Sequence, residues 1–182
     1  MDDAVKSAVA NIHSDDRSVQ GEAFRFLDEL TNKPVGWAYQ VWDVLLKGLT
    51  SKDNRLRSIA SQLLCNLAKS DPEGRILIDF DALFDVTRDD RFVTARHCLL
   101  AIWKIGAAGE SQKQRVVDGL ERRFEECAAE KNRTLIRFDI IQGLRKLYNH
   151  VKDEAIRDKA LDLIATEADL KYREKYAGLW KR

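Results

Sequence analysis

Apolar residues recur along most of this chain at every third or fourth position, which is the spacing of one face of an α-helix. No segment shows the sustained alternation of apolar and polar residues that a half-buried strand would have. The two prolines, Pro34 and Pro72, both follow a predicted helix end. The pattern therefore predicts an all-α protein of about ten helices. The clearest helical stretches are Ala4–Ile12, Val19–Leu30, Val41–Leu49, Leu56–Leu67, Val116–Phe124, Ile136–Leu147 and Ile156–Ile164.

An acidic residue recurs before three of the predicted helices. Asp16, Asp53 and Asp90 are spaced 37 residues apart, and each can accept hydrogen bonds from the unpaired N–H groups of a first helical turn. A fixed period of this size, with one helix pair per unit, is typical of an α-solenoid. We therefore predict a right-handed α-α solenoid of about four to five helix pairs, forming one domain over residues 1–182. The predicted pairs lie near residues 1–32, 35–69, 72–106, 111–149 and 152–182.

The second helix of each pair resembles that of HEAT repeats and, more loosely, of armadillo repeats. In that family an acidic turn is followed by an aliphatic–Arg pair and then by small and large apolar residues. The clearest match is Leu56–Arg57, which precedes the apolar run to Leu67. The first predicted helix pair has Gln20 at the Arg position, and the third has Arg96 about two residues later. The resemblance implies a solenoid that meets its partners on an inner, concave helix face, with no particular chemistry attached.

A helix pair of this size cannot bury its apolar stripe alone, so neighbouring pairs must cover each other. Arg57, Arg96 and Arg137 lie at the edge of the stripe, and we expect them to pair with acidic residues of adjacent units because a partly buried guanidinium needs a partner. The residues predicted to be buried between neighbouring helix pairs are Leu63, Leu64, Leu99, Ile102, Leu120, Ile140 and Leu144.

Small and polar residues form a strip opposite the apolar stripe of the second helices. Such a strip suits an extended peptide or the surface of another protein, contacted through hydrogen bonds. We therefore predict a non-catalytic interaction or scaffold module that binds a protein or peptide there. The predicted contact residues are Ser58, Gln62, Cys65, Thr94, His97, Lys104, Gln142 and Lys146.

The sequence offers no recognisable catalytic or metal-binding motif, so we expect no enzyme activity, no metal and no cofactor. His13, His97 and His150 are far apart, and none is followed by Glu, unlike the paired His-Glu motifs of the metal-binding, HEAT-like deoxyhypusine hydroxylases. His97 and Cys98 are adjacent, but neighbouring helical residues project about 100° apart and cannot share a hydrogen bond. The phosphate-binding glycine motifs and the G-x-S-x-G motif are absent.

Cysteine usage and the N-terminal sequence bear on the compartment. The three cysteines have no CxxC spacing and lie within apolar helical patterns, which is typical of reduced thiols in a cytosolic protein. The N-terminus has no signal-peptide layout, and no apolar stretch approaches the ~20 residues of a membrane span. We expect a cytoplasmic protein with no membrane contact.

A nucleic-acid partner is the alternative, because the chain also resembles the HEAT-like DNA glycosylases of alkylation repair, which hold a duplex in a basic groove. The net charge of +1, from 31 basic and 30 acidic residues, argues against it. The basic residues that could contact phosphates are Arg133, Arg137, Arg145, Lys146, Arg157, Lys171, Arg173 and Lys175.

Overall fold

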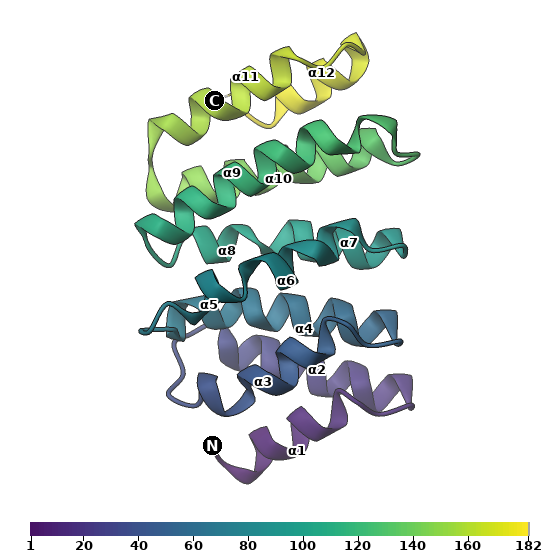
Figure 1. Cartoon of the computed structure of the whole chain (residues 1–182), viewed down its shortest axis with the longest axis vertical. Helices are drawn as coiled ribbons and strands as arrows, with labels where there is room; N and C mark the ends of the chain where they lie inside the picture. The colour runs from purple at the N-terminus through teal and green to yellow at the C-terminus, as the bar shows by residue number, and fades with distance from the viewer. Residues whose placement is uncertain (182) are drawn as a thin grey trace. The chain divides into compact units, whose positions relative to one another are not determined.

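The computed structural model describes residues 1–181, and these residues form twelve α-helices, three short 3-10 helices and no strand (Figure 1). The all-α prediction is therefore confirmed. The helices group into two compact units, Met1–Ala101 and Ile102–Arg182, and each unit is described by itself.

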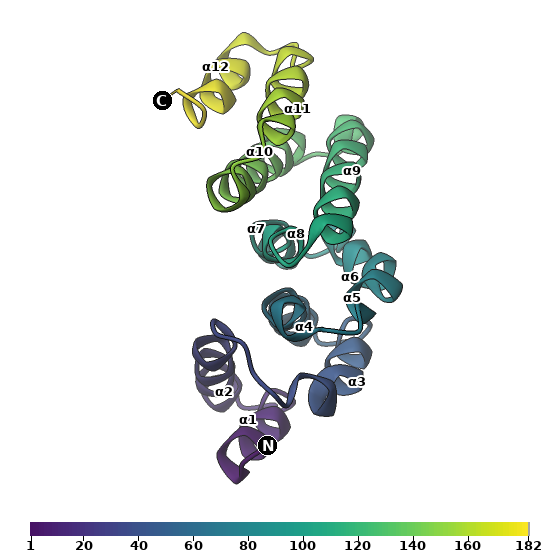
Figure 2. The ribbon, with the colours of Figure 1, turned by 90° about the vertical axis from the view of Figure 1, so that its left-hand side faces the viewer.

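The first unit contains three successive helix pairs. Helix α4 packs against α2, α3 and α7, so it lies at the centre of this unit. Figure 2 shows α2, α4 and α7 on one side, with α3, α5 and α6 on the other. The pairs are α1 (Asp3–Asn11) with α2 (Arg17–Thr31), α3 (Ala38–Gly48) with α4 (Asn54–Leu67), and α5 (Arg75–Ile78) and α6 (Phe80–Asp85) with α7 (Phe92–Ala101).

The second unit also stacks its helices in pairs. Helix α8 packs against α9 and α10, α9 against α11, and α10 against both α11 and α12. Helices α10 and α12 lie on one side of this unit and α9 and α11 on the other (Figure 2). The bounds are α8 (Trp103–Gly106), α9 (Glu110–Glu126), α10 (Arg133–Val151), α11 (Glu154–Ala165) and α12 (Leu170–Gly178).

Aspartate side chains begin the second helices, as the repeat predicts, but with one shift of register. Asp16 accepts from the Ser18 and Val19 amides at 2.8 and 3.3 Å, and Asp53 accepts from the Arg55 amide at 3.1 Å. In the third pair, Asp89 instead of Asp90 accepts from the Arg91 amide, at 2.8 Å. The capping role predicted for Asp90 is therefore wrong: its carboxylate binds Arg57 at 3.0 Å, whereas that of Asp89 binds both Arg57 and the Arg91 amide.

The predicted core is confirmed. All seven apolar residues expected to be buried have an exposed fraction of at most 1%. Cys65, Cys98 and Cys127 are free thiols and are also buried. The apolar stripes of the helices therefore meet as the sequence pattern requires.

The third pair departs from the regular pattern at both of its helices. Its first helix begins at Arg75 instead of Pro72, because the Asp71 carboxylate holds a turn by accepting from the Arg75 and Ile76 amides at 2.9 and 2.7 Å. Gly74 enters that helix with a φ of 69°, in the left-handed region that favours glycine. The second helix is interrupted at Ile102, where the first unit ends and the second begins.

Candidate functional site

The eight predicted contact residues fall in both units, so they form two separate groups. Ser58, Gln62 and Cys65 lie on α4, and Thr94 and His97 on α7, all within the first unit. The second unit holds the other three, with Lys104 on α8 and Gln142 and Lys146 on α10.

Three of the five residues in the first unit do not face solvent. Ser58, Cys65 and Thr94 have exposed fractions of 6%, 0% and 1%, so the prediction that they face outward is wrong. Helix α4 packs against α7, and Thr94 Oγ1 donates to the Asn54 carbonyl oxygen across that contact, at 3.1 Å. Small side chains allow two helices to approach closely, and here their polar atoms find partners inside the protein.

Ser58, Gln62 and His97 form a polar cluster between α4 and α7. Ser58 Oγ lies 2.8 Å from His97 Nδ1, and Gln62 Nε2 donates to both Ser58 Oγ and the Ser58 carbonyl oxygen at 3.1 Å. His97 is exposed at its outer edge, yet burial of part of the ring lowers its pKa, and the charge of Arg96 lowers it further. The imidazole is therefore favoured in its neutral form.

A serine beside a histidine is the pairing of a nucleophile and its base, but this geometry does not suit catalysis. Ser58 is buried, so a substrate carbonyl cannot approach its hydroxyl. Gln62 already donates to the same oxygen. The cluster instead links α4 to α7 through side-chain hydrogen bonds, and it leaves the outer edges of Gln62 and His97 available on this face.

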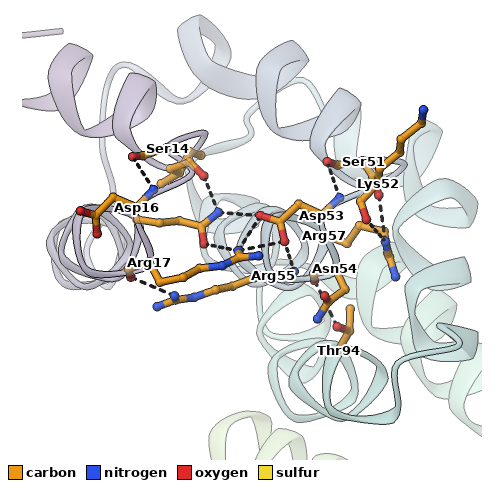
Figure 3. Close-up of polar contacts among 12 residues, drawn as sticks. Ser14, Asp16, Arg17, Ser51, Lys52, Asp53, Asn54, Arg55, Arg57 and Thr94 are labelled. Atoms are coloured by element: carbon orange, nitrogen blue, oxygen red, sulfur yellow. Dashed lines mark hydrogen bonds and ion pairs between the residues drawn. The ribbon is translucent and has the colours of Figure 1, made fainter.

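Ion pairs between successive helix pairs connect the ends of α2, α4 and α7. Arg17 Nη1 lies 3.0 and 2.9 Å from the two carboxylate oxygens of Asp53 (Figure 3). Gln20 Nε2 donates to Asp53 and to the Ile12 carbonyl oxygen, both at 2.9 Å. Arg57 binds Asp89 through two nitrogens at 2.5 and 2.7 Å. The predicted structural role of Arg57 is therefore confirmed.

The second unit contains a comparable buried ion pair. Arg137 donates to Glu167 at 2.8 Å, and its guanidinium lies 4.4 Å from the centroid of the Phe124 ring. Glu167 is 1% exposed, and burial alone would raise its pKa. The hydrogen bonds from Arg137 and the Asp169 amide, together with the charges of Arg137 and Arg133, outweigh burial and lower the pKa. Arg137 therefore has the acidic partner that the sequence predicted. The guanidinium of Arg96 lies 5.7 Å from the centroid of the Phe92 ring.

The surface formed by α10 and α12 is basic. These two helices contain seven basic residues and two acidic ones, Asp139 and Glu174, and Asp139 is fully buried. The other two helices of this unit that are longer than one turn, α9 and α11, contain six basic and eight acidic residues. Charge is therefore segregated between the two sides of the second unit.

Aromatic rings lie against the cations of this basic side. The Arg145 guanidinium is 5.0 Å from the Trp180 ring centroid and 5.4 Å from that of Tyr148, while Lys175 Nζ is 4.9 Å from that of Phe138. Residues three and four apart on a helix are neighbours on its surface, so Gln142 lies beside both Arg145 and Lys146. We call Phe138, Gln142, Arg145, Lys146, Tyr172 and Lys175 the α10–α12 face. The strip prediction included only Gln142 and Lys146; the missed signal was the alternation of aromatic and basic residues in 138–148 and 172–176.

Three of the eight basic residues considered for phosphate binding are used inside the protein. Arg137 pairs with Glu167, Arg157 pairs with Glu154 at 2.8 Å, and Arg173 donates to the Glu167 carbonyl oxygen at 2.7 Å. The other five form no ion pair with any carboxylate among residues 1–181: Arg133, Arg145, Lys146, Lys171 and Lys175. The Nε of Arg133 is buried, so four of these cations remain available on the surface.

No group of three or more His, Cys, Asp or Glu side chains in residues 1–181 is arranged to hold a metal ion. Within these residues, no helix is both long and apolar enough to span a bilayer.

Comparisons with known proteins bear on the fold alone. No known family model matches the sequence, and no curated protein matches it significantly. The chain is similar to two engineered proteins of known structure: the first has a TM-score of 0.59 and 20% identity over 97% of this chain and 77% of the other. The second has a TM-score of 0.56 and 22% identity, over 98% and 79%.

A designed armadillo repeat protein in complex with the peptide (KR)4 is also similar, with a TM-score of 0.49 and 16% identity over 98% of this chain and 88% of that one. Likeness at this level supports no inference about binding. The stacked helix pairs and the likeness to the two engineered proteins support the fold alone, which is an all-α solenoid of helix pairs.

Proposed function

We propose that this protein is a non-catalytic interaction module that binds a protein or peptide on its second helices, above all on the α10–α12 face. The observation that carries the proposal is the presence there of partly exposed rings and of cations without a carboxylate partner in the described chain. Aromatic residues and arginine are the side chains most enriched at the energetic centres of protein interfaces. This surface therefore has the composition of an interface.

The opposite side of the same unit differs, because both lysines of α9 and α11 are paired with carboxylates of the same unit. Lys113 lies 2.5 Å from Asp153, and Lys159 lies 2.6 Å from Glu121. Pairs of this kind link α9 to the start of α11 and to α11 itself. A partner on that side would have to break them, so the α10–α12 face is the better docking surface.

The Ser58–Gln62–His97 cluster is a second, smaller contact surface in the first unit. Gln62 and His97 present polar edges, but their inner atoms are already hydrogen-bonded to Ser58. We expect it to contribute less to binding than the cations of the second unit, because few of its donors and acceptors are unpaired.

Affinity capture from a native cell extract tests the proposal, with one arm treated with nuclease. The bait is the full chain, and its variant carries Arg145→Glu and Lys146→Glu. The control carries Lys47→Glu and Lys52→Glu, which make the same charge change at exposed positions of the first unit. Circular dichroism first establishes that all three baits are folded.

We expect a protein that survives nuclease, is retained by the control and is lost from the α10–α12 variant. Retention of the same proteins by both variants would contradict the proposed surface. Recovery of nucleic acid alone, with no protein surviving nuclease, would favour the nucleic-acid alternative.

A further inference from the structure

We propose that the ligand of the α10–α12 face is an acidic peptide in extended conformation, with two carboxylates about three residues apart. This inference rests on the proposed function and names the chemistry of its partner. It follows from the charge, the ring contacts and the spacing of the cations on this face.

The charge of the face selects an anion. Asp139 is fully buried, so Glu174 is the one carboxylate that α10 and α12 expose, against the cations Arg145, Lys146, Lys171 and Lys175. Complementary potential attracts a partner of opposite sign and excludes one of like sign. A basic peptide would meet repulsion here.

Ring contacts hold two of these cations in place before a ligand arrives. Arg145 lies over both Tyr148 and Trp180, and Trp180 is only 9% exposed, so it offers a fixed platform. Lys175 lies over Phe138. A side chain that is already ordered loses less conformational entropy on binding, and a carboxylate that meets it forms a charge-assisted hydrogen bond.

Helix geometry sets the spacing of the carboxylates. The ring of Phe138, on α10, lies against Lys175 Nζ. Arg145 follows Phe138 by seven residues on the same helix, which is a rise of about 10 Å at 1.5 Å per residue. An extended peptide advances about 3.3 Å per residue, so about three residues cover the same distance. The expected motif is therefore acidic-x-x-acidic.

The number of available cations favours a peptide over a nucleic acid. Phosphate-backbone binding with strong salt dependence uses roughly 6–10 contacts. Of the seven basic residues of α10 and α12, Arg137 and Arg173 are used internally, and the Nε of Arg133 is buried. The other four cations have no ion pair in the described chain. Four cations suit a short carboxylate-bearing segment.

Fluorescence anisotropy with labelled synthetic probes tests the inference on the full-length chain. The probes are an eight-residue Gly/Ser/Tyr peptide with glutamates at positions 3 and 6, the same composition with adjacent glutamates, a version with lysines for glutamates, and a single-stranded oligonucleotide of equal length. The protein variants are Arg145→Gln, Lys146→Gln and Lys175→Gln, with Lys47→Gln as the control.

We expect the spaced-glutamate peptide to bind several-fold more tightly than the adjacent version, and the lysine peptide not to bind. Arg145→Gln and Lys175→Gln should each weaken binding about tenfold, the loss expected for one charge-assisted hydrogen bond. Lys47→Gln should leave the affinity unchanged. Lys146 has no ring contact in the described part of the chain, so Lys146→Gln should weaken binding through the lost charge alone. Comparing it with the other two variants separates the effect of charge from that of the ring contacts.

Equal affinity for the glutamate and lysine peptides, or no effect of the three variants, would overturn the inference. Tighter binding of the oligonucleotide, falling steeply with salt, would assign the face to nucleic acid instead. A protein captured through this face that the spaced-glutamate peptide fails to displace would refute the acidic ligand and leave the proposed function standing.

Discussion

The contact between α3 and α4 provides a sharp test of the packing, because it contains a glycine in a place where helix propensity and sterics oppose each other. Gly48 is the last residue of α3, and its backbone does not have a positive φ. A Cβ atom added there would lie 2.9 Å from the Cβ of Ala60 on α4. Gly48→Ala therefore forces two atoms fixed to backbones into contact.

The expected magnitude follows from two opposing effects. Alanine is favoured over glycine within a helix by roughly 1 kcal/mol, and by less at a helix end. Carbon atoms in ordinary contact are about 3.5–4.0 Å apart, so α3 and α4 must separate by more than half an ångström. Overpacking of this kind costs about 1–3 kcal/mol. We expect Gly48→Ala to lower the free energy of unfolding by about 1 kcal/mol or more.

Urea denaturation followed by circular dichroism measures this change, and a double mutant isolates its cause. Ala60→Gly removes the opposing Cβ, so Gly48→Ala should cost less in that background, with a coupling energy of about 1 kcal/mol. The control is Gly178→Ala on α12, where no atom lies within 4 Å of the added Cβ and we expect no loss. A stable Gly48→Ala protein, or an additive double mutant, would refute this account of the packing.

The remaining predictions concern the core, one ion pair and a thiol. Leu64→Ala should cost about 2–5 kcal/mol in urea denaturation, whereas Leu161→Ala, at a residue 39% exposed, should cost under about 1 kcal/mol; equal costs would contradict the stacking. Burial would raise the pKa of Asp89, but hydrogen bonds led by that from Arg57 outweigh it and lower the pKa. Its contribution to stability is therefore full above the unfolded pKa near ~3.9 and is lost as pH falls through the lower folded value. Asp89→Asn should therefore reduce the loss of unfolding free energy as the pH falls through the acid range. An unchanged pH dependence would count against the Arg57–Asp89 ion pair. Burial raises the pKa of Cys98 to about 12, so mass spectrometry should detect alkylation of Cys98 at pH 8 in urea but very little in the folded protein.

The helices and the core could be predicted from the sequence because their signals are local. Apolar spacing decides which side of a helix is buried, and Leu64 and Leu144 are buried as that spacing requires. Register could not be predicted where two carboxylates are adjacent. Asp89 and Asp90 can each cap a helix and both bind Arg57, but in the folded chain only the Asp89 carboxylate accepts from the Arg91 amide.

The predicted strip was partly wrong because small polar residues occur both on surfaces and in close helix contacts. Ser58 and Thr94 look like surface residues in the sequence, but α7 covers one side of α4 and the partner atoms for their hydroxyls lie across that contact. Composition does not show whether a hydroxyl is hydrogen-bonded to protein or to water. The three-dimensional neighbours decide it.

Paired helices with acidic starts follow from local sequence, since helix periodicity and capping depend on residues only a few positions apart. Which cations remain available for a partner depends instead on how the helices pack. Arg137 is neutralised by Glu167, 30 residues away, whereas Arg145 lies over Trp180, 35 residues away, without an ion pair in the described chain. Ion pairs and ring contacts join residues from different helices, so the basic face could be identified only after the helices were packed.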